Sequence, residues 1–255
     1  MVGPPWIDNI SKQPKNKPFA LDPRTPDFNV EKHPPVNRQN IQTVNKSVKL
    51  FFQTLHYFVI LVYMYLIFDT ETTGLPKRWD LPLTDSENWP RCIQIAWQIH
   101  DSNGAIISHK DYLIKPDNFT IPFDSEKIHG ISTALASKEG FPLSKVLSEF
   151  KRALEKIKYI VGHNVSFDRN IMGAEFFRAG LLDPLENKAI IDTCTEETAK
   201  LCQLPGGRGG KFKLPTLSEL YHFLFQQSFE EAHNATADVE AVSYTHLTLP
   251  TTPYV

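Results

Sequence analysis

Four acidic side chains and one histidine lie in three short segments of the chain, each beside an apolar run. They are Asp69, Glu71, Asp168, His233 and Asp238. Hard divalent cations such as Mg²⁺ and Mn²⁺ prefer oxygen ligands, and two of them about 3.5–4 Å apart can bind both the attacking and the leaving oxygen of a phosphoryl transfer. These residue types therefore predict metal-dependent hydrolysis of a phosphodiester, which is the chemistry of a nuclease.

The first segment has the most informative spacing. Residues 65–68 form a continuous apolar run, which predicts a strand buried on both faces that ends at Asp69. Side chains two positions apart in a strand point the same way, so Asp69 and Glu71 should share one face. An isolated Asp-x-Glu is more often a strand that runs into a polar turn. Here a Thr-Thr-Gly follows, and its small residues would let a substrate backbone approach closely.

The second segment repeats this arrangement. Residues 159–161 predict a short buried strand, residues 162–164 turn the chain, and Ser166 can cap a following helix. Asp168 then falls in the first helical turn. The helix dipole also favours a carboxylate there, so Asp168 taken alone is as well explained by helix stability as by metal binding.

The third segment places His233 five positions before Asp238, with small residues between them. We expect Asp238 to open a helix and to contribute an oxygen to the site. A histidine near a helix start is usually an exposed or capping residue. An ordinary pKa near 6.5 would also suit a general base that takes a proton from the attacking water.

In this order and context the three segments resemble the DEDDh exonucleases, and within them the epsilon-type proofreading exonucleases of bacterial DNA polymerase III. The resemblance covers about residues 64–242. It includes residues 128–131, similar to the family's nucleotide-pocket segment, and residues 214–217, similar to the start of its penultimate helix. Some polymerase III alpha subunits carry such a domain at their N-terminus, and residues 65–79 and 202–217 resemble that subgroup.

The resemblance implies a role for each residue. Asp69 would bridge two Mg²⁺ or Mn²⁺ ions, and Glu71 and Asp238 would bind the ion on the nucleophile side. Asp168 would serve the ion on the leaving-group side, partly through water, and His233 would be the base. The pocket for the terminal nucleotide would be lined by Thr72, Thr73, Ile128, His129 and Phe167.

The implied reaction is the release of nucleoside monophosphates from the 3′ ends of single-stranded DNA, in proofreading during DNA replication. The implied partner is the polymerase alpha subunit, either as a separate chain or fused to this domain. Two alternatives remain open at this point: an exoribonuclease of the same family, and a non-catalytic scaffold domain of a polymerase assembly. Loss of one of the acids would favour the scaffold, and all of them are present.

The segments between these motifs predict an α/β fold. Residues 92–99 alternate in polarity, and residues 105–107 and 112–114 follow after a turn, which indicates a hairpin beside the first strand. Residues 189–191 indicate a last short strand. One helical stripe is formed by Val146, Leu147, Phe150, Leu154 and Ile157. We therefore expect a ribonuclease H-like, mixed five-stranded sheet flanked by helices, with the acids near its centre.

Composition limits the modes of binding. The 255 residues are 41% hydrophobic, enough for a sizeable core, and the net charge of −2 argues against strong nonspecific binding of nucleic acid. Such a domain would receive DNA from a partner or hold only a few terminal nucleotides. Cys92, Cys194 and Cys202 are odd in number and form no C-x₂-C pair, so they predict neither disulfides nor a zinc site. We expect a reducing compartment, the cytoplasm.

Residues 205–213 are rich in glycine and basic residues. They do not form a Walker A loop, because Pro205 occupies the position of the first glycine and Phe212 follows Lys211. This stretch is either a solvated connection or a loop that contacts phosphates near the site.

Both ends look foreign to the exonuclease domain, which we expect at residues 64–242. Residues 1–63 are predicted to be a disordered or non-native extension, and their apolar run at 50–63 is shorter than the roughly 20 residues of a membrane span. We expect no membrane association. The helix that opens at Asp238 should stop near Val242, because residues 243–255 are rich in β-branched residues and prolines, and this tail is also predicted to be non-native.

Overall fold

The computed structural model describes residues 64–229 and 232–249. The expectations for residues 1–63 and for the end of the tail, 250–255, lie outside these residues. No helix in the described parts of the chain is long and apolar enough to cross a bilayer.

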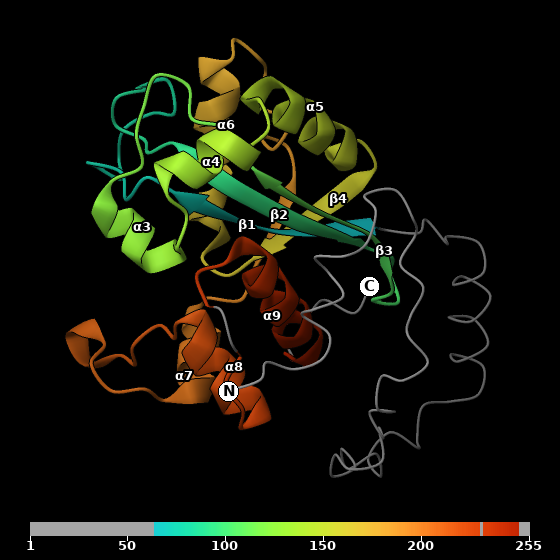
Figure 1. The fold of residues 1–255 in the computed structure, drawn as a ribbon. Helices are drawn as coiled ribbons and strands as arrows, with labels where there is room; N and C mark the ends of the chain where they lie inside the picture. Colours follow the sequence, from blue (N-terminus) through green and yellow to red (C-terminus); the bar gives the residue numbers. More distant parts are fainter. Residues whose placement is uncertain (1–63, 230–231, 250–255) are drawn as a thin grey trace, which may run out of the picture. The chain divides into compact units, whose positions relative to one another are not determined.

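A five-stranded mixed sheet forms the centre of the domain (Figure 1). The strand order is β3-β2-β1-β4-β5, with antiparallel pairs at β3-β2 and β2-β1 and parallel pairs at β1-β4 and β4-β5. The strands are β1 (Met64–Thr72), β2 (Cys92–His100), β3 (Ile106–Leu113), β4 (Ile157–Gly162) and β5 (Ala189–Asp192). The expected ribonuclease H-like sheet and its hairpin are confirmed.

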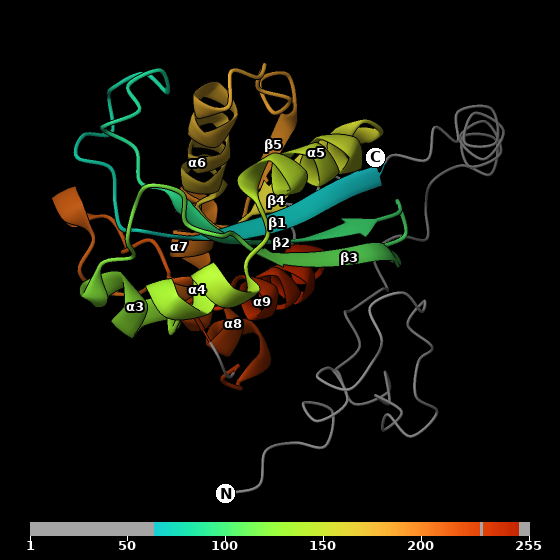
Figure 2. The same cartoon turned by 45° about the horizontal axis from the view of Figure 1, so that its top comes forward.

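Helices cover both faces of the sheet, as the two views show (Figures 1 and 2). Side chains of β1 alternate between them. Leu66 and Phe68 are buried with α5 (Leu143–Leu154) and α6 (Val165–Arg178). Ile67 points the other way and is buried with Ala235, Val239 and Val242 of α9 (Ala235–Thr248). By the same alternation Asp69 and Glu71 belong to the α9 face.

The remaining helices lie in the connections. They are α3 (Phe123–His129), α4 (Thr133–Glu139), α7 (Glu196–Cys202), the 3₁₀ turn η3 (Arg208–Gly210) and α8 (Leu217–Phe225). Thr216 begins α8 with a capping box, in which its side chain accepts from Glu219 N and the Glu219 side chain accepts from Thr216 N. Residues 214–217 thus lead into the penultimate helix, as expected.

Three local predictions are wrong. Helix α6 begins at Val165, and its N-cap is Asn164 in the left-handed conformation, not Ser166. Ile157 begins β4 instead of ending the stripe of α5, because the chain turns after Leu154 and Ile157 pairs with Met64. Strand β1 continues through Asp69 to Thr72, because β2 pairs with it along this stretch.

Helix α9 also corrects a prediction, since it continues past Val242 to Thr248. Ser243, Thr245 and His246 are buried on it. The Thr245 hydroxyl donates to the carbonyl of Val242, which satisfies a buried β-branched side chain inside a helix. Packing therefore overrides the low helix propensity of this stretch, and the helix ends before Pro250.

Candidate active site

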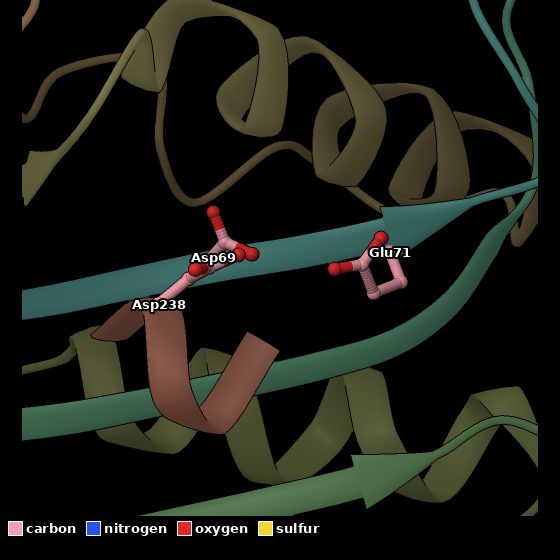
Figure 3. A group of neighbouring side chains, drawn as sticks. All are labelled: Asp69, Glu71 and Asp238. Carbon is pink, nitrogen blue, oxygen red and sulfur yellow. The ribbon is translucent and has the colours of Figure 1, made fainter. Parts of the chain in front are cut away.

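Three carboxylates meet between β1 and α9. One oxygen each from Asp69, Glu71 and Asp238 lies within 4.8 Å of the other two. Figure 3 shows Asp238, in the first turn of α9, reaching the side chain of Asp69, with Glu71 further along β1. The period of two in β1 brings its two acids to one face, and α9 brings the third.

Polar contacts fix the start of α9 over the sheet. Ala235 N donates to Oε1 of Gln94, on β2, at 3.4 Å, and Gln94 pairs with Glu71 in the sheet. The Asn234 side chain caps α9 by accepting from Thr236 N. Together these contacts hold Asp238 opposite β1.

Asp168 lies outside this group of three. Its Oδ1 accepts from the backbone N of Thr70 at 3.0 Å and from the Thr70 hydroxyl at 2.6 Å, and its side chain is buried. Thr70 stands between Asp69 and Glu71 in β1, so its side chain points to the α6 face. The structure therefore ties Asp168 to Thr70, between the two acids of β1 and outside the three-carboxylate group.

Burial raises the pKa of the four acids predicted for the site. The pKa of Asp69 is well above its ordinary value, first through burial and then through the negative charges of Asp168, Asp238 and Glu71. Burial and the charges of Asp238 and Asp168 raise the pKa of Glu71 to about 8. Burial also raises the pKa of Asp168 to about 7, although the hydrogen bonds from Thr70 oppose it. Asp168 is thus electrostatically part of the site.

Asp238 behaves in the same way. Burial raises its pKa to about 6, against a hydrogen bond from His233 N that lowers it. Within the described residues, no salt bridge reaches any of these four acids. Clustered carboxylates without a basic partner repel one another, and a divalent cation with oxygen ligands would remove that repulsion. The donor set of Asp69, Glu71 and Asp238 therefore fits such an ion.

His233 is beside this group, but the contact is made by its backbone. Its N–H donates to Asp238 Oδ2 at 3.1 Å, and its side chain is exposed. The backbone has a φ of 70°, a left-handed conformation that non-glycine residues rarely adopt and that is common at functional sites.

The two threonines expected in the nucleotide pocket use their hydroxyls to shape the turn after β1. The Thr72 hydroxyl donates to the carbonyl of Gly74 at 2.7 Å. The Thr73 hydroxyl accepts from Arg91 N at 2.9 Å, and Thr73 N donates back to Arg91 O. Their side chains therefore hold the turn beside the acids.

The other expected pocket residues lie on two helices. His129 ends α3, and its Nδ1 accepts from Ile131 N at 3.0 Å. Burial lowers its pKa, against a backbone hydrogen bond to Thr72 that raises it. Ile128 beside it is 59% exposed. Phe167, on α6 directly before Asp168, is partly buried against the core.

Sequence reasoning missed three residues of this region. Thr70 binds Asp168, and Gln94 binds the start of α9. Trp79 lies against Phe167 at a ring-centroid distance of 5.8 Å. For Thr70 a signal was available, because alternation in β1 places it on the face opposite Asp69. The other two contacts join segments far apart in the chain.

Comparison with known proteins agrees with this site. A family model described as RNase_T, Exonuclease, matches residues 66–245. The 3′-5′ exonuclease DinG of Bacillus subtilis is 31% identical over 177 residues, which are 69% of this chain and 16% of DinG. A PolC-type DNA polymerase III of Lacticaseibacillus paracasei is 28% identical over 188 residues, 71% of this chain and 11% of the polymerase. The chain spans less than a fifth of the length of these two relatives.

Solved structures agree on the fold. A zinc-bound complex of E. coli ExoI with single-stranded DNA superposes with a TM-score of 0.58 at 20% identity, over 75% of this chain and 41% of ExoI. Apo exonuclease I gives a TM-score of 0.54 at 20% identity, over 72% and 41%. The resemblance read from the motifs is confirmed at the level of the family: the chain belongs to the RNase T exonuclease family, the DEDDh 3′–5′ exonucleases.

Proposed function

We propose that this chain removes nucleoside monophosphates from the 3′ ends of DNA, with proofreading during replication as its role. The observation that carries the proposal is the three-carboxylate group between β1 and α9, with its raised pKa values and no basic partner in the described chain. DNA is favoured over RNA because the PolC-type relatives are named as DNA polymerases and the related ExoI structure holds single-stranded DNA.

Each residue has a distinct task in this reaction. Asp69, Glu71 and Asp238 would hold Mg²⁺ or Mn²⁺, with Asp168 serving a second ion. The bound ions would supply positive charge to the phosphoryl oxygens. Thr70 keeps one oxygen of Asp168 fixed, so that only the other is free to face the site. Thr72, Thr73, Ile128, His129 and Phe167 would hold the terminal nucleotide.

His233 would take the proton from the attacking water. Its backbone bond to Asp238 fixes the start of the side chain beside the acids, while the exposed imidazole can move over the substrate. His233→Ala should lower kcat by about 10²–10⁴-fold. Metal affinity, measured by calorimetry, should stay unchanged, and a loss of metal binding would make His233 a ligand instead.

The substrate and direction can be tested with 5′-labelled DNA and RNA oligonucleotides of one sequence. With Mg²⁺ we expect DNA to shorten from the 3′ end one nucleotide at a time, and a chelator or Asp69→Asn to stop the reaction. Internal cleavage would contradict the exonuclease assignment. Faster degradation of RNA would make the chain an exoribonuclease of the same family.

The proofreading role has its own test. A primer–template with a mismatched 3′ end exposes single-stranded DNA, so we expect it to be degraded faster than a matched one. The polymerase alpha subunit, in trans or fused, is the proposed partner, because PolC-type polymerases are among the relatives. The presence of DinG among the relatives makes a role outside proofreading the alternative, which equal rates on the matched and mismatched 3′ ends would favour.

Three free cysteines support a cytoplasmic location.

A further inference from the structure

The segment between β1 and β2, residues 73–91, contains neither helix nor strand. Connections longer than about 12–15 residues are uncommon in compact domains, and most are either disordered or functional. This one begins directly after the Asp69 and Glu71 strand. In both views it lies on the α6 side of the sheet (Figures 1 and 2).

Hydrogen bonds hold this segment in one conformation. The Arg178 guanidinium, from α6, donates to the carbonyls of Ser86 and Trp89 at 2.7 and 2.5 Å. Asn88 bridges across the segment, since its side chain accepts from Arg78 N at 2.8 Å and donates to Arg78 O at 2.9 Å. The segment is therefore ordered, which leaves a functional reason for its length.

Trp79 stands on this ordered segment with 57% of its surface exposed. The residue before Trp79 is Arg78, and the Asn88 side chain binds both the N–H and the carbonyl of Arg78. The indole packs against Phe167 at 5.8 Å between ring centroids, with 54° between the planes. A single exposed apolar side chain is ordinary. An exposed tryptophan packed against the residue that precedes Asp168 offers an aromatic face for binding.

We propose that Trp79 stacks on a nucleobase of the DNA strand, in a nucleotide that precedes the terminal one. Phe167 is adjacent to Asp168 in sequence and belongs to the pocket proposed for the terminal nucleotide. Trp79 packs on the ring of Phe167. Aromatic side chains stack on any base, so this surface would bind single strands without sequence preference. The inference rests on the proposed function, because it needs a DNA end in the site.

Two substrates separate this role from the hydrolysis itself. The p-nitrophenyl ester of thymidine 5′-monophosphate has one base only, whereas an eight-residue oligo(dT) has bases upstream. For Trp79→Ala we expect KM for oligo(dT) to rise about tenfold or more with kcat nearly unchanged, and the ester to be hydrolysed at the wild-type rate. Trp79→Phe should restore most of the affinity, because it keeps a stacking face.

Phe177→Ala is the matched control, since Phe177 is an exposed aromatic on α6, 46% accessible, ten residues beyond Phe167. It should leave both substrates unaffected. A wild-type KM for oligo(dT) in Trp79→Ala would overturn the inference and leave a protein partner as the occupant of this surface. An equal loss on both substrates would also overturn it, because Trp79 would then act on the terminal nucleotide or on the fold.

Binding to inactive protein separates a failure of this inference from a failure of the proposed function. In the Asp69→Asn background, Trp79→Ala should bind fluorescently labelled oligo(dT) about tenfold more weakly than the parent. Equal affinities would overturn the stacking role even if the wild-type enzyme is an exonuclease. If the wild-type protein hydrolyses neither substrate, the proposed function fails, and a tenfold loss of affinity would still support the stacking surface.

Discussion

Carboxylates that are at least partly buried occur in two places in this domain, and their partners differ. Glu175, on α6, is completely buried, and its Oε1 accepts from Arg91 Nε and Cys92 N, both at 2.9 Å. Arg178 Nη1 lies 3.2 Å from the same oxygen. The group of Asp69, Glu71 and Asp238 has no salt bridge within the described residues.

The presence or absence of basic partners distinguishes a structural carboxylate from carboxylates of the active site. A buried carboxylate with arginine partners is electrically balanced within the fold, and at Glu175 the balance ties α6 to the start of β2 and to the 73–91 segment. Burial raises the pKa of all three carboxylates of the site, and neighbouring acids raise it further at Asp69 and Glu71. An added cation would balance their charge. The carboxylates without basic partners, Asp69, Glu71 and Asp238, form the site. Glu175, which has arginine partners, supports the segment that carries Trp79.

The largest expected effect is on activity. Asp69→Asn should lower exonuclease activity by about a thousandfold, because it removes a negative charge that would bind the metal. It should leave the free energy of unfolding without metal unchanged or higher, since one of three repelling groups is gone. Chemical denaturation in chelator measures this. Asp117→Ala, at an exposed acid, is the control and should change neither quantity. A large loss of stability in Asp69→Asn would remove the contrast with Glu175.

The reverse result is expected at Glu175. Glu175→Ala should lower the free energy of unfolding by about 3 kcal/mol, because Arg91 and Arg178 lose their shared partner in a largely buried place. Urea denaturation would measure this change. The exposed pair Glu149–Arg152 provides the control, and Glu149→Ala should cost only about 0.5 kcal/mol. Equal effects at the two positions would mean that burial does not distinguish them.

Added metal should stabilise the protein through the group of Asp69, Glu71 and Asp238 and not through Glu175. Mg²⁺ at about 100 times its dissociation constant should raise the free energy of unfolding of the wild-type protein by about 2.7 kcal/mol. The gain should be much smaller in Asp69→Asn and should persist in Glu175→Gln. Thermal unfolding with and without Mg²⁺ tests this, and stabilisation that survives in Asp69→Asn would place the ion elsewhere.

The buried histidine His246, on α9, can be compared with these carboxylates, because burial favours its neutral form. Burial, followed by the positive charge of His100, lowers its pKa to about 4. The folded pKa lies below the ordinary value near 6.5, so stability is full above pH 6.5 and falls as the pH drops toward 4. Between pH 7 and pH 5 the loss should be about 2 kcal/mol.

The raised pKa values of the active-site acids act in the opposite direction over this range. The measurement is therefore the difference between wild type and His246→Gln, which should lose this part of the pH dependence. If the difference in free energy of unfolding between the two proteins stays the same from pH 7 to pH 5, the pKa of His246 is not lowered.

Much of the fold followed from local pattern. Apolar runs and alternation located all five strands, and the family resemblance of residues 214–217 located the start of α8. Alternation in β1 also fixed the shared face of Asp69 and Glu71, because a strand offers only two directions for a side chain. These features depend on neighbours in the sequence.

The extent of α9 did not follow from the sequence. Its last six residues have weak helix propensity, and their helical conformation depends on burial of Thr245 and His246 by distant segments. Tyr65, on β1, packs edge-on against His246 at 5.2 Å between ring centroids. Such packing outweighs propensities of a few tenths of a kcal/mol per residue.

The sequence by itself determined which side chains could bind a metal, because residue type and strand period are local properties. Only the tertiary structure decided which of them meet. Gln94 holds α9 so that Asp238 joins the two acids of β1, and Thr70 holds Asp168 beside them. The fixed position of Trp79 likewise depends on Arg178 and Asn88. Each of these choices is made by hydrogen bonds between segments that no local pattern relates.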